Sequence, residues 1–71
     1  MARLQLPDIV FLRTAPRLPA GEIYQALGVS RARVWQWRHR GHNFPLTTDG
    51  TIDTAAVAKW LRRWGCRVEW L

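Results

Sequence analysis

Residues 21–40 have the sequence GEIYQALGVSRARVWQWRHR, in which a glycine separates two stretches with a helical pattern. In the first stretch, Ile23 and Leu27 lie four residues apart and would face the same side of a helix. Gly28 then suits the left-handed backbone conformation that commonly ends a helix. A first helix over Gly21–Leu27 is therefore predicted, with a tight turn after it.

The second stretch predicts a helix from the N-cap Ser30 to Arg40, because no proline or glycine interrupts it and Gly41 follows. At about 100° per residue, Val34 and Trp37 fall on one face and are expected to point into the core. The opposite, polar face consists of Ala32, Trp35, Gln36 and His39. Arginines flank this face on both sides, Arg31 and Arg38 on one and Arg33 and Arg40 on the other.

The segment after the second helix predicts a hairpin and then a third helix. The Asp49-Gly50 pair is a strong signal for a tight hairpin turn, so residues 44–52 are expected to form a wing beside the second helix. The polar tip of this wing is formed by Thr47 and Thr48. Asp53 is the expected N-cap of a third helix that continues to about Trp64. Its core-facing positions are Val57, Trp60, Leu61 and Trp64.

The two ends of the chain predict short strands. Asp8–Arg13 is rich in β-formers and Arg67–Leu71 alternates in polarity, while prolines mark residues 16–19 as a linker. The predicted fold is therefore mainly α, a small winged helix-turn-helix with a short β-hairpin wing and short terminal strands. Residues 1–18 are expected to form an extended N-terminal segment, and residues 19–71 the winged helix-turn-helix domain.

The charge balance of the 71 residues favours a polyanionic partner. Eleven basic residues, ten of them arginine, stand against five acidic ones, which gives a formal net charge of +6. Arginine suits bidentate recognition of phosphate and of guanine. No acidic residue between Glu22 and Asp49 neutralises the arginines of the second helix. A polar face between two rows of guanidinium groups suits a helix that lies between two phosphate backbones.

Several other classes of protein are excluded by the sequence. The single cysteine, Cys66, allows no intrachain disulfide, and neither an apolar run of membrane-spanning length nor a signal peptide is visible, so a cytoplasmic location is expected. Ser30 is the only serine and is needed as a cap, and the acidic residues are scattered, so no catalytic residue, small-molecule substrate or cofactor is expected. His39 and His42 do not form a zinc pattern with Cys66, so no metal site is expected.

Two parts of the sequence resemble a known family. Glu22–Ser30, followed by Val34 and Trp37, is similar to the helix-turn-helix signature with its glycine turn. The continuation resembles the MerR-like winged-helix domains through Gly41, Phe44-Pro45, Asp49-Gly50-Thr51-Ile52-Asp53 and Ala55-Ala56-Val57-Ala58-Lys59-Trp60-Leu61. Such domains occur in phage excisionases and in phage small terminase subunits. The resemblance covers about residues 20–64, and Tyr24 stands where the motif usually has a small residue.

These observations predict a protein that binds double-stranded DNA in a sequence-specific manner. The expected DNA-binding residues are Ser30, Arg31, Ala32, Arg33, Trp35, Gln36, Arg38, His39, Arg40, Thr47 and Thr48. The resemblance implies a transcriptional regulator or an excisionase-like recombination directionality factor of a phage or mobile element. The alternatives are a small terminase subunit that initiates DNA packaging and a protein-interaction module on the same fold.

Three points stay open at the level of the sequence. Trp35 is expected to contact DNA, the wing or a second subunit. The terminal strands pair either within one chain or between copies, the latter giving a homodimer or a cooperative oligomer on DNA. The basic residues near the end of the third helix are either solvated and favoured by the helix dipole or in contact with phosphate. They are Lys59, Arg62, Arg63 and Arg67.

Overall fold

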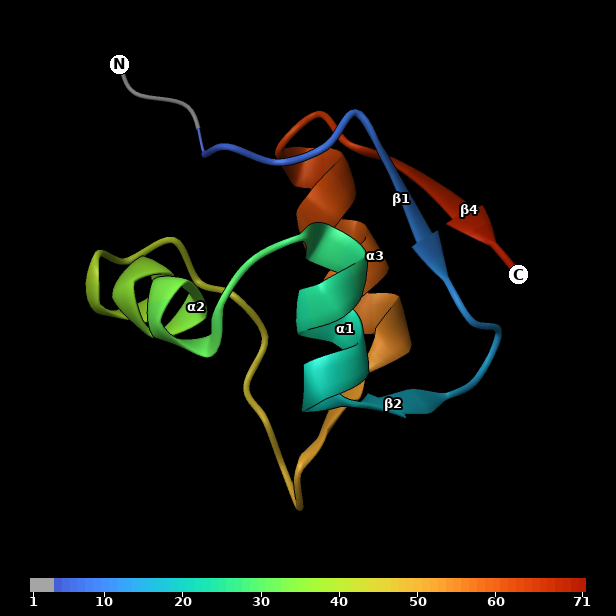
Figure 1. The fold of residues 1–71 in the computed structure, drawn as a ribbon, viewed down its shortest axis with the longest axis horizontal. Helices are drawn as coiled ribbons and strands as arrows, with labels where there is room; N and C mark the ends of the chain where they lie inside the picture. Colours follow the sequence, from blue (N-terminus) through green and yellow to red (C-terminus); the bar gives the residue numbers. More distant parts are fainter. Residues whose placement is uncertain (1–3) are drawn as a thin grey trace.

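The computed structural model describes residues 4–71, which form three helices and four short strands (Figure 1). In chain order the elements are β1 (Ile9–Leu12), β2 (Arg17–Pro19), α1 (Ala20–Leu27), α2 (Arg31–His39), β3 (Thr51–Asp53), α3 (Thr54–Arg63) and β4 (Arg67–Trp70). The strands make two separate two-stranded sheets, one parallel and one antiparallel. The result is a small α/β domain, whereas the sequence predicted a mainly α fold, because β2 and β3 form a second sheet beside that of the terminal strands. None of the helices over residues 4–71 is long and apolar enough to cross a membrane.

All three predicted helices are present, and their ends follow the predicted caps. The Ser30 hydroxyl accepts a hydrogen bond from the backbone N–H of Arg33 at 3.1 Å. The Asp53 carboxylate accepts from the N–H groups of Ala55 and Ala56 at 3.0 and 3.3 Å. Gly28 ends α1 with a φ of 69°, the left-handed conformation that favours glycine.

The two ends of the chain meet in a parallel sheet. β1 pairs with β4 in a register that sets Val10 beside Val68 and Leu12 beside Trp70. The terminal strands therefore pair within one chain, which is one of the two arrangements that the sequence left open. Val10 and Leu12 belong to the same core as the helices, together with residues of every other element.

The expected linker at residues 16–19 is instead strand β2, which pairs with β3. Leu18 lies opposite Ile52, and both side chains are fully buried. Arg17 adds two bonds to β3, since its side chain donates to the hydroxyl and to the carbonyl of Thr51. The two prolines signalled a linker, but Pro19 is tolerated at the end of this short edge strand, and burial of Leu18 outweighs the local signal.

The expected wing over residues 44–52 is reduced to a minimal hairpin. A single bridge joins Thr48 and Thr51 around Asp49 and Gly50, whose φ values of 54° and 75° fit a tight two-residue turn. The strand after this turn pairs with β2 and not with residues 44–47. The chain before the turn is drawn away from the hairpin because the ring of Phe44 is buried in the core.

Candidate nucleic-acid interface

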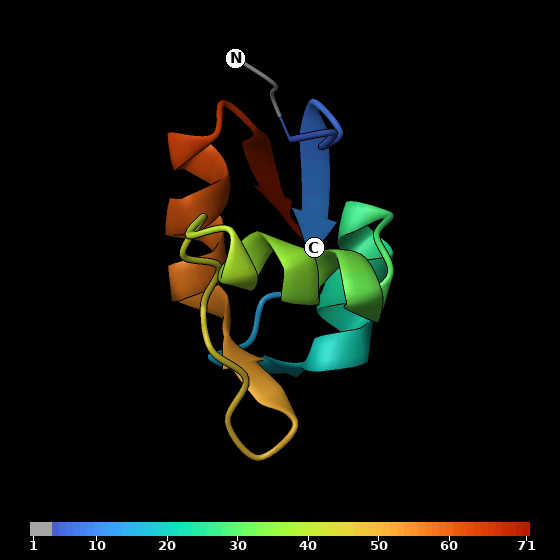
Figure 2. The same ribbon diagram turned by 90° about the vertical axis from the view of Figure 1, so that its left-hand side faces the viewer.

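Helix α2 lies across one face of the domain, with α1 on one side of it and α3 on the other (Figure 2). It is attached through two side chains, Val34 and Trp37, which are 3% and 4% exposed. The prediction that these two residues point inward is therefore confirmed. Every other residue of α2 is exposed, so most of its surface is available to a ligand.

An aromatic cluster holds α2 against α3. The ring of Trp37 lies 5.4 Å from that of Trp60 and 5.9 Å from that of Phe44, and Phe44 meets Trp60 edge-on at 4.9 Å. The indole N–H of Trp60 donates to the carbonyl of His42 at 2.8 Å, and the N–H of His42 donates to the carbonyl of Trp37 at 2.9 Å. Packing and hydrogen bonds together fix the orientation of α2 and of the chain that leaves it.

The outward surface of α2 carries a dense and uncompensated positive charge. We use the name α2 surface for the exposed side chains of this helix and its C-cap, which are Arg31, Ala32, Arg33, Trp35, Gln36, Arg38, His39 and Arg40. Within residues 4–71, the ion pairs join Arg13 to Glu22 and Arg67 to Glu69, so no carboxylate pairs with an arginine of α2. The guanidinium groups therefore keep their charge and hydrogen-bonding capacity for a partner outside the chain.

Trp35 is the large apolar side chain of the α2 surface. It is 60% exposed, and its ring stacks on that of His39 one turn later, with centroids 3.7 Å apart and planes tilted by 38°. This stacking restricts the motion of both rings before any ligand binds. At 60% exposure, more than half of the Trp35 side chain is open to a partner.

A groove runs between the α2 surface and the first turn of α1. Its volume is about 570 Å³, and Arg31, Trp35 and Arg38 form its α2 side. Tyr24 and Thr47 also line this groove, and their hydroxyl oxygens lie 3.5 Å apart. The sequence did not indicate Tyr24 as a site residue, although its departure from the motif's usual small residue marked the position as unusual.

The remaining predicted site residues have mainly structural contacts. The Ser30 hydroxyl is engaged in the cap of α2. The carbonyl and N–H of Thr48 bond to Thr51 across the hairpin turn. Thr47 alone of the predicted wing tip reaches the groove beside α2. Across residues 4–71, no three histidine, cysteine or acidic side chains gather in a way that could hold a metal ion.

The fold and the site together define the class of protein: a small α/β domain with an arginine-lined helix on its surface. The chain matches no known protein family, no curated protein and no solved structure. Its function must therefore be argued from the site itself.

Proposed function

We propose that the protein binds duplex DNA in a sequence-specific manner, with α2 in the major groove. The observation that carries this proposal is the α2 surface, where four arginines without a carboxylate partner in residues 4–71 surround polar side chains. A helix of this width fits the major groove, and guanidinium groups on both flanks suit the two phosphate backbones. The α1–turn–α2 unit and the adjoining hairpin are then interpreted as a winged helix-turn-helix.

Base recognition falls to the middle of the α2 surface. Gln36 suits adenine and Arg31 suits guanine, each through two hydrogen bonds at the base edge, and His39 is the third candidate. Arg33 and Arg40 suit phosphate contacts, which position the helix without regard to sequence. The stacked ring of Trp35 suits an apolar contact with a thymine methyl group or a sugar.

The groove between α1 and α2 supports the same interpretation. Beside Arg31, Arg38 lines it together with the hydroxyls of Tyr24 and Thr47. Guanidinium and hydroxyl groups are the donors that proteins use most on the DNA backbone. Together with the resemblance to MerR-like domains, these features favour a role in transcriptional control or in recombination directionality.

Two measurements test the proposal. Selection of bound duplexes from a random pool should enrich one short sequence, and binding to it should weaken steeply with salt. If about five phosphates are contacted, the log–log slope of affinity against salt should be about −4 to −5. A shallow slope, equal enrichment of all sequences, or stronger binding to duplex RNA of the same sequence would each reject the proposal.

A further inference from the structure

The outer edge of β4 is an unpaired strand edge. On its inner side, the N–H of Arg67 donates to the carbonyl of Asp8, the residue before β1, at 2.8 Å. The N–H of Leu71 donates to the carbonyl of Leu12 in β1, also at 2.8 Å. Because hydrogen bonding alternates along a strand in a parallel pair, the peptide groups of Val68 and Trp70 point to the opposite side. No other strand of residues 4–71 pairs with β4 on that side, so these groups can receive an added strand.

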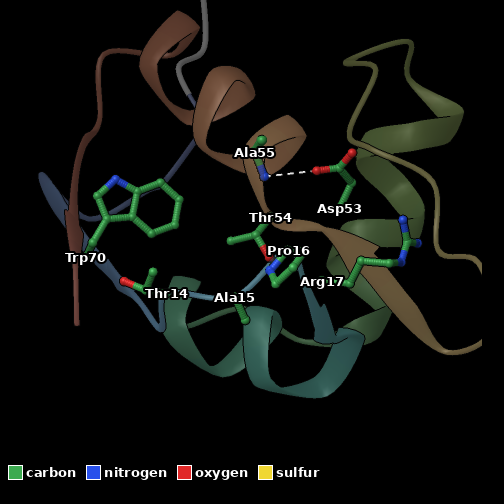
Figure 3. A pocket seen from close by; sticks show the side chains of 8 residues that line it. All are labelled: Thr14, Ala15, Pro16, Arg17, Asp53, Thr54, Ala55 and Trp70. Carbon is green, nitrogen blue, oxygen red and sulfur yellow. Dashed lines mark hydrogen bonds between the residues drawn. The ribbon is translucent and has the colours of Figure 1, made fainter.

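An apolar groove adjoins the end of this edge (Figure 3). The ring of Trp70, a residue that is 44% exposed, faces Thr54 and Ala55 in the first turn of α3, and Ala15 and Pro16 also line the groove. The groove has a volume of about 810 Å³ and is open to solvent. An exposed indole beside an open apolar groove is typical of a surface that receives an apolar side chain.

Positive charge lies next to the edge and the groove. Lys59 and Arg62 follow Ala55 at helical spacing on the exposed stripe of α3, and Arg63 lies beside them. No carboxylate within residues 4–71 pairs with these three residues, and Arg67 of β4 has only a long contact of 3.8 Å with Glu69. Ala55 and Trp70 line the same groove, and Lys59 and Arg62 lie on the same stripe of α3 as Ala55. A strand added to β4 beside Trp70 would therefore run close to this basic stripe.

From the edge, the groove and the charge together we infer that β4 docks an extended acidic segment of a partner protein. The backbone of that segment pairs with Val68 and Trp70, and one of its apolar side chains enters the groove beside the Trp70 ring. Its carboxylates face Lys59 and Arg62. This is strand addition to a sheet edge, in which the backbone contributes affinity and alternate side chains contribute specificity.

A second copy of the chain is a poorer occupant of this edge. Symmetric pairing of two β4 strands would bring the two α3 stripes towards each other. Each stripe carries Lys59, Arg62 and Arg63, so like charges would meet across the interface. An acidic segment neutralises the same charges. The docking site is also separate from the α2 surface and does not depend on the proposed DNA binding.

Binding of synthetic peptides tests the inference on the intact protein. The probe is a fluorescent eight-residue peptide of alternating valine and glutamate, followed by anisotropy at low salt. Two controls leave the protein unchanged: a peptide of alternating valine and lysine, and the glutamate peptide with N-methyl groups on alternate amides. Each control should bind at least about tenfold more weakly, because the first reverses the charge and the second removes the strand hydrogen bonds.

Paired variants and NMR locate the bound peptide. The double variant Lys59→Gln/Arg62→Gln should weaken binding of the glutamate peptide about tenfold, and Arg33→Gln/Arg40→Gln on α2 should leave it unchanged. The amide signals of Val68 and Trp70 should shift on titration. Amide shifts confined to α2, or equal losses of peptide affinity in both variants, would show that the peptide is attracted nonspecifically by positive charge, and would overturn the inference.

Two further outcomes would assign the surface to another occupant. If Lys59→Gln/Arg62→Gln weakens duplex DNA binding as much as Arg33→Gln/Arg40→Gln, the basic stripe belongs to the DNA interface and the inference is wrong. Sedimentation tests whether the edge belongs to a second copy. It does if the protein is a dimer that the unmethylated peptide dissociates and the N-methyl peptide leaves intact. Failure of DNA binding, by contrast, would leave the peptide result unaffected.

Discussion

Helices α2 and α3 have similar lengths and nearly opposite uses of their surfaces. α3 buries five of its residues, and its N-cap Asp53 accepts two backbone hydrogen bonds. α2 buries two residues, and its N-cap Ser30 accepts one. α3 therefore belongs to the core, whereas α2 is attached at one side and exposes the rest to solvent. In a small domain, a helix with so little buried surface needs another reason for its sequence, and the proposed DNA binding would supply one.

The same difference shows that the position of α2 depends on few buried side chains. Because α2 has few buried contacts, its position depends strongly on the ring of Trp37 and on the neighbouring rings of Phe44 and Trp60. Loss of one of these rings should affect the orientation of α2 as well as stability. The exposed side chains of α2 can be changed with little effect on folding.

The largest effect is expected for Trp37→Ala. Removing this buried ring should lower the free energy of unfolding by about 3–5 kcal/mol, because a cavity opens between α2 and α3. Chemical denaturation measures the change. Trp35→Ala is the matched control, since Trp35 is 60% exposed on the same helix and should change stability by about 0.5 kcal/mol or less. Equal losses in the two variants would show that α2 is not anchored as described.

The sequence predicted the helices well because their signals are local. Periodic apolar residues, the caps Ser30 and Asp53, and the glycine after α1 each act within a few residues of the element they define. The inward direction of Val34 and Trp37 followed from the same periodicity. The exposure of the α2 arginines followed from it too.

The strands and the groove were less accessible to prediction because they depend on distant parts of the chain. Leu18 is buried only because Ile52 lies opposite to it, and no pattern within residues 16–19 reveals that pairing. Tyr24 meets Thr47 only through the path of the loop that Phe44 anchors. The basic residues of α3 and the edge of β4 were visible singly, but their proximity is a result of the fold.

The next effect in size concerns specificity on the α2 surface. Gln36→Ala should cost about 1–3 kcal/mol of binding free energy on the preferred duplex and relax the preference at one base pair. Arg33→Ala should weaken binding to all duplexes alike and reduce the salt slope by about one, because a phosphate contact is lost. Competition among duplexes with single base changes measures both. A uniform loss for Gln36→Ala would show that another residue of α2 recognises the bases.

The two N-caps allow a smaller and direct comparison of α2 and α3. Asp53→Ala and Ser30→Ala should each lower the free energy of unfolding by about 0.5–2 kcal/mol, with the larger loss for Asp53. Asp53 accepts from two N–H groups, and its charge also interacts favourably with the helix N-terminus. Denaturation in the absence of DNA measures the difference. A larger loss for Ser30→Ala would show that the second hydrogen bond and the charge of the Asp53 cap do not make it the stronger one.

The smallest effect is expected at α1, the helix that precedes α2. Arg13 donates through Nε and Nη2 to the two carboxylate oxygens of Glu22 at 3.0 and 2.9 Å, which joins the segment after β1 to the first turn of α1. These hydrogen bonds, aided by the charge of Arg13, hold the pKa of Glu22 below its ordinary value. A depressed carboxyl pKa stabilises the folded state above the unfolded pKa, and this stabilisation is lost as the pH falls through the folded pKa.

The thermal midpoint should therefore fall slightly as the pH drops below the ordinary pKa of a glutamate, and part of that fall should be absent in Glu22→Gln. The change should be small because both side chains are exposed to water and screened by salt. Repeating the titration at high salt should reduce it further. Ser30→Ala is a control for the titration, because it leaves the Arg13–Glu22 pair intact and should retain the acid-dependent fall. A Glu22→Gln protein with an unaltered acid profile would mean that the pair seen in the structure does not contribute to holding α1 against β1.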